Sequence, residues 1–344
     1  MVIILSFFFI QISQSQIFPG LVGEPLVNAL RDAYTPLHLL NDTQVKDTLY
    51  ARVFIEGDSV RCIYSGLARF LPEGVDPSQW LYGTGLEVGS INLEHSWPQA
   101  KGAGEGTNGN MDMHHLFPSR AIINSVRGDF PYAEIDDNVT QKWYYLGNET
   151  TAKPITNIDA YSEFVSGNFE PRESVKGDIA RALFYFWTIY REDAMQADPD
   201  FFESQLSNLC QWHEQDPVDS IEALRNERIA GYQDGKLNPF ILDCSLVKRA
   251  YCSQLDDCEI VSTSEHNAQS VLINFFPALQ QFSISGDEHY YLWNLRVVDL
   301  LGHIVYSTRL SIGALSDPIS LPSGIYMVSA FNGHQVLVHK FYVP

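Results

Sequence analysis

The sequence predicts an α+β protein, in which a larger, mostly helical domain precedes a small β-sandwich. In KGDIARALFYFWTIYRED, which begins at Lys176, apolar residues recur every three or four positions, as in a helix with one wide apolar face. From about residue 269 the chain instead alternates in short β-rich runs. Because 344 residues exceed one usual domain, one large and one small domain are expected.

The first fifteen residues resemble a secretory signal. An apolar run over residues 2–10 precedes Ser13 and Ser15 at the small positions of a cleavage site, although the usual basic residue before the run is missing. A membrane-spanning helix needs roughly 20 apolar residues, and this run is about half that length. We therefore expect a soluble, exported, monomeric protein without a transmembrane anchor.

The cysteine content and the net charge restrict the function classes. The five cysteines lack the close pairs of a zinc knuckle, so in an exported chain we expect disulfides with one thiol left over, in an unspecified pairing. The net charge of -20 argues against binding nucleic acid by bulk electrostatics. It does not exclude a nuclease, because a bound metal and a few arginines can supply local positive charge.

A second helix is predicted from DPVDSIEALRNERIAGYQDG. Asp216 suits the N-cap and Pro217 the first helical position, and Asp219 falls in the first turn. Asp234 and Gly235 mark a turn beyond the end of the helix.

The C-terminal region contains two hairpin signals. Leu301-Gly302 and Asn332-Gly333 each lie between β-rich runs. The predicted organisation is a signal peptide (residues 1–15), a large domain (16–258), a polar linker (259–268) and a C-terminal β-sandwich (269–344).

The segment LEHSWPQAKGAGEGTNGNMDMHHLFPSRAIINSVRGDF concentrates polar and titratable residues. Residues 93–97 are predicted to form a short strand and residues 111–117 a second one, separated by a glycine-rich loop. A short helix should follow, with Ser119 as its N-cap and Gly128 at its end.

A ββα-metal finger has a histidine at the end of its first strand, then a loop and a second strand, and then an asparagine in the helix that follows. His95 and Asn124 occupy these positions. Phosphodiester hydrolysis needs a base for water, a divalent cation for the phosphate and a proton for the leaving oxygen. Arg120, Asn124 and Arg127 share one helix face, for which exposure to solvent is the alternative interpretation.

These motifs resemble the bacterial endonuclease I family of exported, non-specific nucleases. The family pattern is EH, then a variable loop, then D-L-H-[NH]-L-x-P, and an Asn in the next helix. The corresponding residues of this chain are EH, DMHHLFP and Asn124. The resemblance continues in FEPRESVKGDIAR, WHEQDPVDSIEALRNERIAGYQ and LNPFILD, and covers roughly residues 25–250.

The resemblance implies that His95 is the general base and that Glu94 and Asn124 bind one Mg²⁺, with Mn²⁺ or Ca²⁺ as alternatives. Oxygen ligands suit such a hard cation, which usually keeps several waters. Adjacent strand residues point to opposite faces, so Glu94 and His95 share a site only if the strand twists or ends there.

Three cations are predicted to bind substrate: Arg127 as a phosphate clamp, with Arg172 and Lys176 as secondary candidates against a role as surface charge. The loop QAKGAGEGTNGNM has one Lys and no Arg, which leaves a transition-state arginine unidentified. Of His114 and His115, one is expected to be a hydrogen-bonded core histidine. Asp112 is expected to anchor the loop rather than to bind metal.

The C-terminal residues VVDLLGHIVY and LPSGIYMVSAFNGHQVLVHKFYV resemble the sorting domain of proteins exported by the type IX system of Bacteroidota. This implies delivery to the cell surface or the medium, the export machinery as a partner, and removal of the domain during export. The alternative is an ordinary surface-binding β-module.

The resulting hypothesis is a secreted, sequence-non-specific, metal-dependent endonuclease. It would cut DNA, with RNA as a further substrate, to leave 5′-phosphate and 3′-hydroxyl ends. The alternative is a catalytically inactive, surface-attached binding protein on the same scaffold, which the acidic charge favours. A metallopeptidase is excluded at WHEQD because the second histidine one helical turn later is missing.

Overall fold

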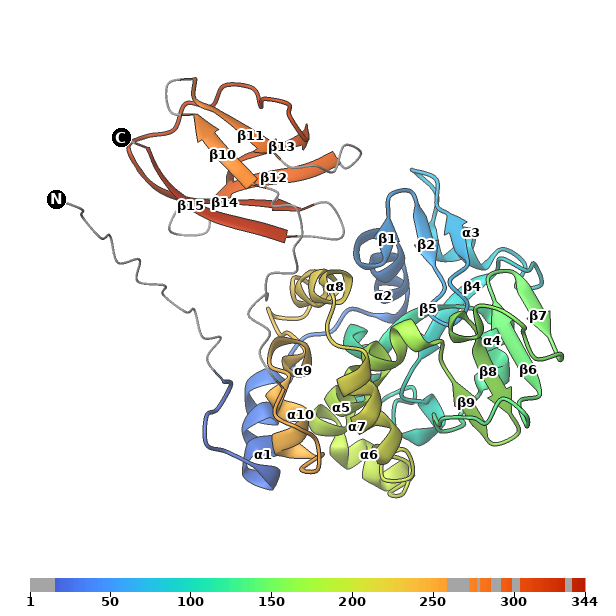
Figure 1. Ribbon diagram of the computed structural model, residues 1–344. Coiled ribbons are helices and arrows are strands. Elements are labelled where there is room, and N and C mark those ends of the chain that lie inside the picture. Colours follow the sequence, from blue (N-terminus) through green and yellow to red (C-terminus); the bar gives the residue numbers. More distant parts are fainter. Residues whose placement is uncertain are drawn as a thin grey trace. The chain divides into compact units, whose positions relative to one another are not determined.

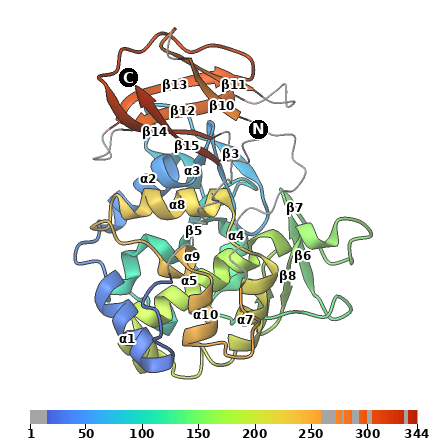
Figure 2. The same cartoon turned by 60° about the vertical axis from the view of Figure 1, so that its left-hand side comes forward.

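The computed structural model describes residues 16–258, 272–276, 279–285, 292–298, 304–331 and 336–343 (Figures 1 and 2). The chain divides into two compact units, Met1–Ile260 and Val261–Pro344, which are treated separately below. The predicted signal peptide and linker lie outside the described residues. Within the described part of the chain, no helix has both the length and the apolar character needed to cross a membrane.

The first unit is built around α5 (Lys176–Ile189), the helix predicted from its apolar period. Thirteen of its fourteen residues are buried, so the helix is enclosed on all sides rather than on the one face expected. The other helices of this unit are α1 (Gly23–Tyr34), α2 (Asp42–Thr48), α3 (Pro77–Tyr82), α4 (Ala121–Arg127), α6 (Arg191–Ala197), α7 (Leu206–Gln215), α8 (Ser220–Ala230), α9 (Pro239–Leu242) and α10 (Ser245–Ala250). In Figure 1, α7, α9 and α10 gather around α5, on the side of this unit away from β6 and β7.

The second predicted helix is α8, but Asp216 does not cap it. The side chain of Asp219 accepts from the backbone N–H of Glu222 and serves as the N-cap. Asp216 instead accepts from the backbone N–H of Gly177 in the first turn of α5. The motif therefore contains two capping aspartates. Asp219 caps α8, and Asp216 caps the start of α5, about 40 residues earlier in the chain.

Three small antiparallel sheets accompany these helices, as an α+β fold requires. They are β1–β2–β3 (Ile55–Glu56, Ser59–Arg61, Ala68–Phe70), β7–β6–β8–β9 (Asn148–Thr150, Lys142–Tyr145, Ser162–Val165, Asn168–Glu170) and the pair β4–β5 (Ile91–His95, Leu116–Arg120). Trp97 anchors the chain just beyond β4 because its fully buried ring stacks on Phe186 of α5, with 4.8 Å between centroids. The end of β4 is thus fixed against the central helix.

Disulfides use four of the five cysteines. Cys210 pairs with Cys252 and Cys244 with Cys258, and both bonds tie the last helices of the unit together. Cys62 is a buried free thiol. The expectation of disulfides with one thiol left over is confirmed.

The second unit consists of antiparallel strands. These are β10 (Leu272–Phe276) paired with β11 (Gln281–Ser285), and a sheet of β12 (Leu292–Val298), β13 (Ile304–Ser311), β14 (Gly324–Phe331) and β15 (Val336–Val343) in the order β13–β12–β14–β15. Phe282 of β11 and Trp293 of β12 belong to one core cluster, so the two sheets share a core. The strands on either side of both predicted hairpins pair antiparallel, while the hairpin residues themselves lie outside the described ranges.

Candidate active site

The strand pair β4–β5 and helix α4 form the framework of the site. Glu94 lies opposite Phe117 and His95 opposite Leu116 in an antiparallel register, and α4 follows β5 directly. Ser119 lies inside β5 and does not cap the helix, whose N-cap position is Arg120. Gly128 ends the helix as predicted, with a φ of 58° that glycine adopts without strain.

The connection between the two strands contains short 3₁₀ turns. Of the second strand predicted over residues 111–117, only the last two residues belong to β5, which begins at Leu116. Asn108–Met111 and Met113–His115 form 3₁₀ turns instead. The Asp112 side chain accepts from the backbone N–H of His114, which starts the second turn. The strand was predicted from the residue pattern, but the hydrogen bond from the backbone to the Asp112 side chain favours a turn at this position.

Glu94 lies in an enclosed polar pocket and is 1 % exposed. Its Oε1 accepts a 2.8 Å hydrogen bond from the hydroxyl of Tyr64 and lies 3.3 Å from Nη1 of Arg127. Burial raises the pKa of Glu94 to about 7, although Arg127 and the Tyr64 hydroxyl act in the opposite direction. Oε2 accepts no hydrogen bond from the described residues, so one oxygen is committed and the other is available.

Asn124 of α4 faces β4. Its Nδ2 donates to the side-chain oxygen of Asn92 at 3.0 Å and to the carbonyl of Leu93 at 2.9 Å. Because both donor positions are directed at β4, the amide orientation is fixed, and Oδ1 accepts no hydrogen bond from the described part of the chain. The structure therefore brings Asn124 to the strand that carries Glu94, and each side chain keeps one unengaged oxygen.

His95 is the last residue of β4, and its imidazole turns toward the connecting loop. Nε2 lies 3.0 Å from the carbonyl oxygen of Asn110 and 3.1 Å from Asn110 Oδ1. Since a carbonyl oxygen only accepts, Nε2 carries the proton and Nδ1 keeps its lone pair. Nδ1 has no hydrogen-bond partner among the described residues and is the nitrogen that can accept a proton.

The pKa of His95 is lowered by burial, while its hydrogen bonds to Asn110 act in the opposite direction. The positive charges of Lys46 and Arg127 lower it further. A lowered pKa keeps the imidazole neutral at neutral pH, which is the form that accepts a proton.

His114 and His115 are both core residues, where one was expected. His114 Nε2 donates to the carbonyl of Lys236 at 2.9 Å, and His115 Nε2 donates to that of Gly109 at 2.7 Å. The Nδ1 of His115 is buried without a partner, and burial lowers the pKa of this residue to about 3. Neither imidazole is therefore exposed for contact with a large substrate.

Asp112 anchors the loop, as predicted. Its two carboxylate oxygens accept from the hydroxyls of Tyr185 and Tyr190 on or next to α5, from Nε2 of Gln233 and from the backbone of His114. The side chain is completely buried. Four donors fix the loop that orients the His95 imidazole.

The polar face of α4 points into the protein and not into solvent. Arg120 is 3 % and Arg127 is 1 % exposed. Nη1 of Arg127 donates to the backbone carbonyl of His95 at 3.0 Å, and Nη2 donates to that of Ser96 at 2.6 Å. Arg127 thus links the Glu94 side chain to the backbone at the end of β4, where the strand stops as the geometry of the site requires.

Arg172 and Lys176 lie away from this pocket. Nε of Arg172 donates to the backbone carbonyl of Ile63 and Nη1 donates to Ser174. Lys176 is 2 % exposed, and its Nζ lies 2.8 Å from Glu134, 2.7 Å from Glu170 and 2.5 Å from Glu173. Burial alone would lower the pKa of Lys176, but its hydrogen bonds to these glutamates raise it above its ordinary value.

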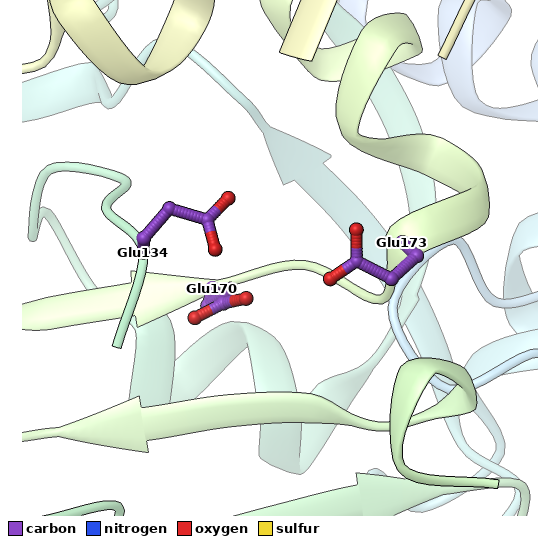
Figure 3. Close-up of side chains that lie close together, drawn as sticks. All are labelled: Glu134, Glu170 and Glu173. Atoms are coloured by element: carbon purple, nitrogen blue, oxygen red, sulfur yellow. The ribbon is translucent and has the colours of Figure 1, made fainter. Parts of the chain in front are cut away.

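Figure 3 shows the carboxylates of Glu134, Glu170 and Glu173 turned toward a common centre, in an arrangement that could hold a metal ion. The ammonium of Lys176 occupies that centre and donates to all three groups. This cluster is therefore an ion-pair network with its own internal cation.

Three residues of the site were missed from the sequence. Tyr64 and Tyr132 contact each other beside Glu94, and Asn110 contacts His95. Tyrosines are common in apolar segments, and no spacing relates residue 64 to residue 94 or 132. Only Asn110 could have been singled out, because it lies in the loop between the two predicted strands.

Comparison with known proteins gave two family matches. Residues 64–244 match the model described as Endonuclease I, which is more than half of the chain. Residues 276–344 match the model described as a secretion system C-terminal sorting domain.

Curated relatives include secreted nucleases. An extracellular ribonuclease of Bacillus amyloliquefaciens is 36 % identical over 172 residues, which cover 46 % of this chain and 52 % of the relative. An extracellular deoxyribonuclease of Aeromonas hydrophila is 30 % identical over 131 residues, which cover 38 % of this chain and 48 % of the relative. The chain spans about half the length of these relatives.

Proposed function

We propose that this chain, which belongs to the Endonuclease I family, is an exported endonuclease that hydrolyses the phosphodiester bonds of nucleic acid with a single divalent cation. The observation that carries the proposal is the state of His95. Its Nε2–H is held by Asn110, which leaves Nδ1 as the basic nitrogen, and Glu94 and Asn124 of the same strand–helix unit each keep one oxygen without a donor among the described residues.

We interpret the unit β4–β5–α4 as a ββα-metal finger. The antiparallel pair, the helix directly after it and the position of His95 at the end of the first strand support this interpretation. We likewise interpret the second unit as a β-sandwich, on the basis of two antiparallel sheets with a common core.

His95 is the proposed general base. Nδ1 takes a proton from the attacking water as the new phosphorus–oxygen bond forms and the bond to the 3′ oxygen breaks. The imidazolium keeps its Nε2–H donated to the Asn110 carbonyl, so the ring does not have to reorient during the step. The products are a 5′-phosphate and a 3′-hydroxyl.

Glu94 and Asn124 fit a hard divalent cation. The available atoms are a carboxylate oxygen and an amide oxygen, which are the ligand types that Mg²⁺, Mn²⁺ and Ca²⁺ take. A cation held by these two residues would supply positive charge to the phosphate and would acidify nearby water as a proton source for the leaving oxygen. We propose Mg²⁺ as the physiological ion.

The roles of the three arginine and lysine candidates differ from those first predicted. The guanidinium of Arg127 is buried against Glu94 and three backbone carbonyls, which supports a role in orienting Glu94 rather than in binding phosphate. The ammonium of Lys176 is enclosed by three carboxylates, and Arg172 braces the backbone at Ile63. For Arg172 and Lys176, substrate binding remains a prediction that the geometry does not favour.

The proposed substrate is DNA, with RNA as a further one, because curated relatives carry the names of a ribonuclease and a deoxyribonuclease. Sequence preference is not proposed, since it would need side chains aimed at base edges. The terminal sorting domain supports export through the type IX system, which is the proposed partner machinery.

The test is digestion of supercoiled plasmid, and separately of single-stranded RNA, by the purified chain with Mg²⁺ or with EDTA. We expect cleavage only with metal, and a loss of roughly 10²–10⁴-fold in rate for His95→Ala. His38→Ala is the matched control, because the His38 side chain is 83 % exposed and pairs with Asp234. If wild type and His95→Ala are equally inert across divalent metals, the chain is a binding protein on a nuclease scaffold.

A further inference from the structure

The carboxylate of Glu94 lies at the end of a buried chain of hydroxyl groups. Tyr64, Glu94, Tyr132 and Arg127 are each at most 1 % exposed, although all four carry a polar or charged group at the tip. Burial of so many polar tips is costly unless each is satisfied. The arrangement of their hydrogen bonds therefore defines what Glu94 can do.

Tyr64 donates a hydrogen bond to Glu94 and Arg127 forms an ion pair with it, and the nearest contact of each is to the same oxygen. Oε1 accepts from Tyr64 at 2.8 Å and lies 3.3 Å from Arg127 Nη1, whereas Oε2 accepts nothing from the described residues. A carboxylate held in this way cannot rotate without losing both contacts. It offers one oxygen to a cation and not two.

The direction of the hydroxyl chain is fixed by proton count. A tyrosine hydroxyl has one proton, and Tyr64 donates its proton to Glu94. The 2.6 Å contact between the hydroxyls of Tyr64 and Tyr132 must then be donated by Tyr132. Tyr132 is itself held by Gln205, which accepts from its backbone N–H, and by Arg127, whose guanidinium carbon lies 4.5 Å from the centre of the Tyr132 ring.

From this geometry we propose that Tyr64, supported by Tyr132, is a positioning residue for the metal ligand: it fixes Glu94 so that Oε2 binds the cation as a monodentate ligand. Tyr64 does not touch the cation or the substrate. Hydrogen bonds to a ligand from outside the coordination sphere typically change metal affinity by about 10–100-fold. This inference rests on the proposed assignment of Glu94 as a ligand.

The experiment compares three tyrosine-to-phenylalanine variants of the full chain. Tyr64→Phe removes the donor to Glu94, and Tyr132→Phe removes the donor to Tyr64 without touching Glu94. Tyr144→Phe is the matched control, because Tyr144 is also completely buried but its hydroxyl has no hydrogen-bond partner among the residues that the structure describes. Two quantities are measured: the dissociation constant for Mn²⁺ by calorimetry without nucleic acid, and the Mg²⁺ concentration for half-maximal cleavage.

We expect Tyr64→Phe to raise the Mn²⁺ dissociation constant and the Mg²⁺ midpoint by about tenfold, and Tyr132→Phe to raise both by a smaller factor. The cleavage rate at saturating Mg²⁺ should change little, and Tyr144→Phe should match wild type. A purely structural role would lower the unfolding midpoint and leave the metal titrations unchanged.

Unchanged metal titrations in Tyr64→Phe and Tyr132→Phe would overturn the inference. The proposed function would still stand if cleavage by the wild type depends on metal. If Tyr64→Phe does not fold, Tyr132→Phe alone decides by the same criterion. A wild type that neither binds Mn²⁺ nor cleaves would overturn the proposed function, and this inference with it.

Discussion

Two acidic regions of the first unit differ in what neutralises them. Glu94 stands beside one buried arginine, whose Nη1 lies 3.3 Å from Oε1, and an amide oxygen of Asn124 lies on the same strand–helix unit. Glu134, Glu170 and Glu173 converge on the ammonium of Lys176, which uses its donors on all three. The region with more carboxylates therefore already contains its cation.

If Glu94 and Asn124 hold the cation as proposed, the number of carboxylates is a poor guide to a metal site. A cation binds where an oxygen has no competing donor, and the protein leaves such an oxygen on Glu94. An internal ammonium instead converts a convergent cluster into a structural ion-pair network. Five variants and a measurement of proton release test this contrast, and the largest effect is expected for Lys176→Met.

Lys176→Met should destabilise the fold strongly. It leaves Glu170, which is 5 % exposed, beside two other carboxylates without a cation. Removing one partner of a buried ion pair costs about 3–5 kcal/mol, and the lower end applies here because Glu134 and Glu173 are about half-exposed. The measurement is the urea-induced unfolding free energy.

Lys153→Met is the control for this effect. Its partner is Asp137, and both side chains are well exposed, so a loss of at most about 1 kcal/mol is expected. Equal losses for the two variants would show that Lys176 does not hold the acidic cluster together.

Asn124→Ala should weaken metal binding by at least about tenfold, because it removes one of two oxygen ligands. Asn124→Asp keeps an oxygen at that position and should retain binding. Calorimetric titration with Mn²⁺ measures both variants against wild type.

Glu173→Gln is the matched change in the other acidic region, where a carboxylate is lost without a proposed ligand role. Its Mn²⁺ affinity should equal that of wild type. If Mn²⁺ affinity falls for Glu173→Gln but not for Asn124→Ala, the metal ion binds at the cluster of Glu134, Glu170 and Glu173 and not at Asn124.

Metal binding should release protons at acidic pH. Burial raises the pKa of Glu94 to about 7, so the metal-free protein holds a proton there below that pH and must lose it to bind a cation. Affinity should therefore rise with pH up to about 7 and then level off, with about one proton released at pH 6 and almost none at pH 8.5.

Titrations in buffers of different ionisation enthalpy measure this proton release. An absence of release at pH 6 would mean that Arg127 and Tyr64 keep Glu94 ionised before the metal arrives. Glu173→Gln should leave the proton release unchanged, since its carboxylate lies in the Lys176 cluster.

Much of the fold and part of the site could be predicted from local sequence. The apolar period at Lys176 located α5, and the glycine at position 128 located the end of α4. The strand over residues 111–117 was predicted incorrectly, because alternation cannot reveal that the Asp112 side chain starts a 3₁₀ turn. The cap of α8 was misassigned because Asp216 acts on a residue of α5, which no local rule considers.

Period, spacing and residue type, which are local properties of the chain, predicted the class of the two units, the order of the motifs, the cysteine usage, and His95 and Asn124 as candidate site residues. The assignment of Glu94 as a metal ligand came from the family resemblance. The tautomer of His95, the free oxygen of Glu94, and the burial of Arg127 and Lys176 became visible only in the folded structure. Those depend on which donors from distant segments reach each atom, and hydrogen-bond partners such as Tyr64 and Tyr132 have no sequence period.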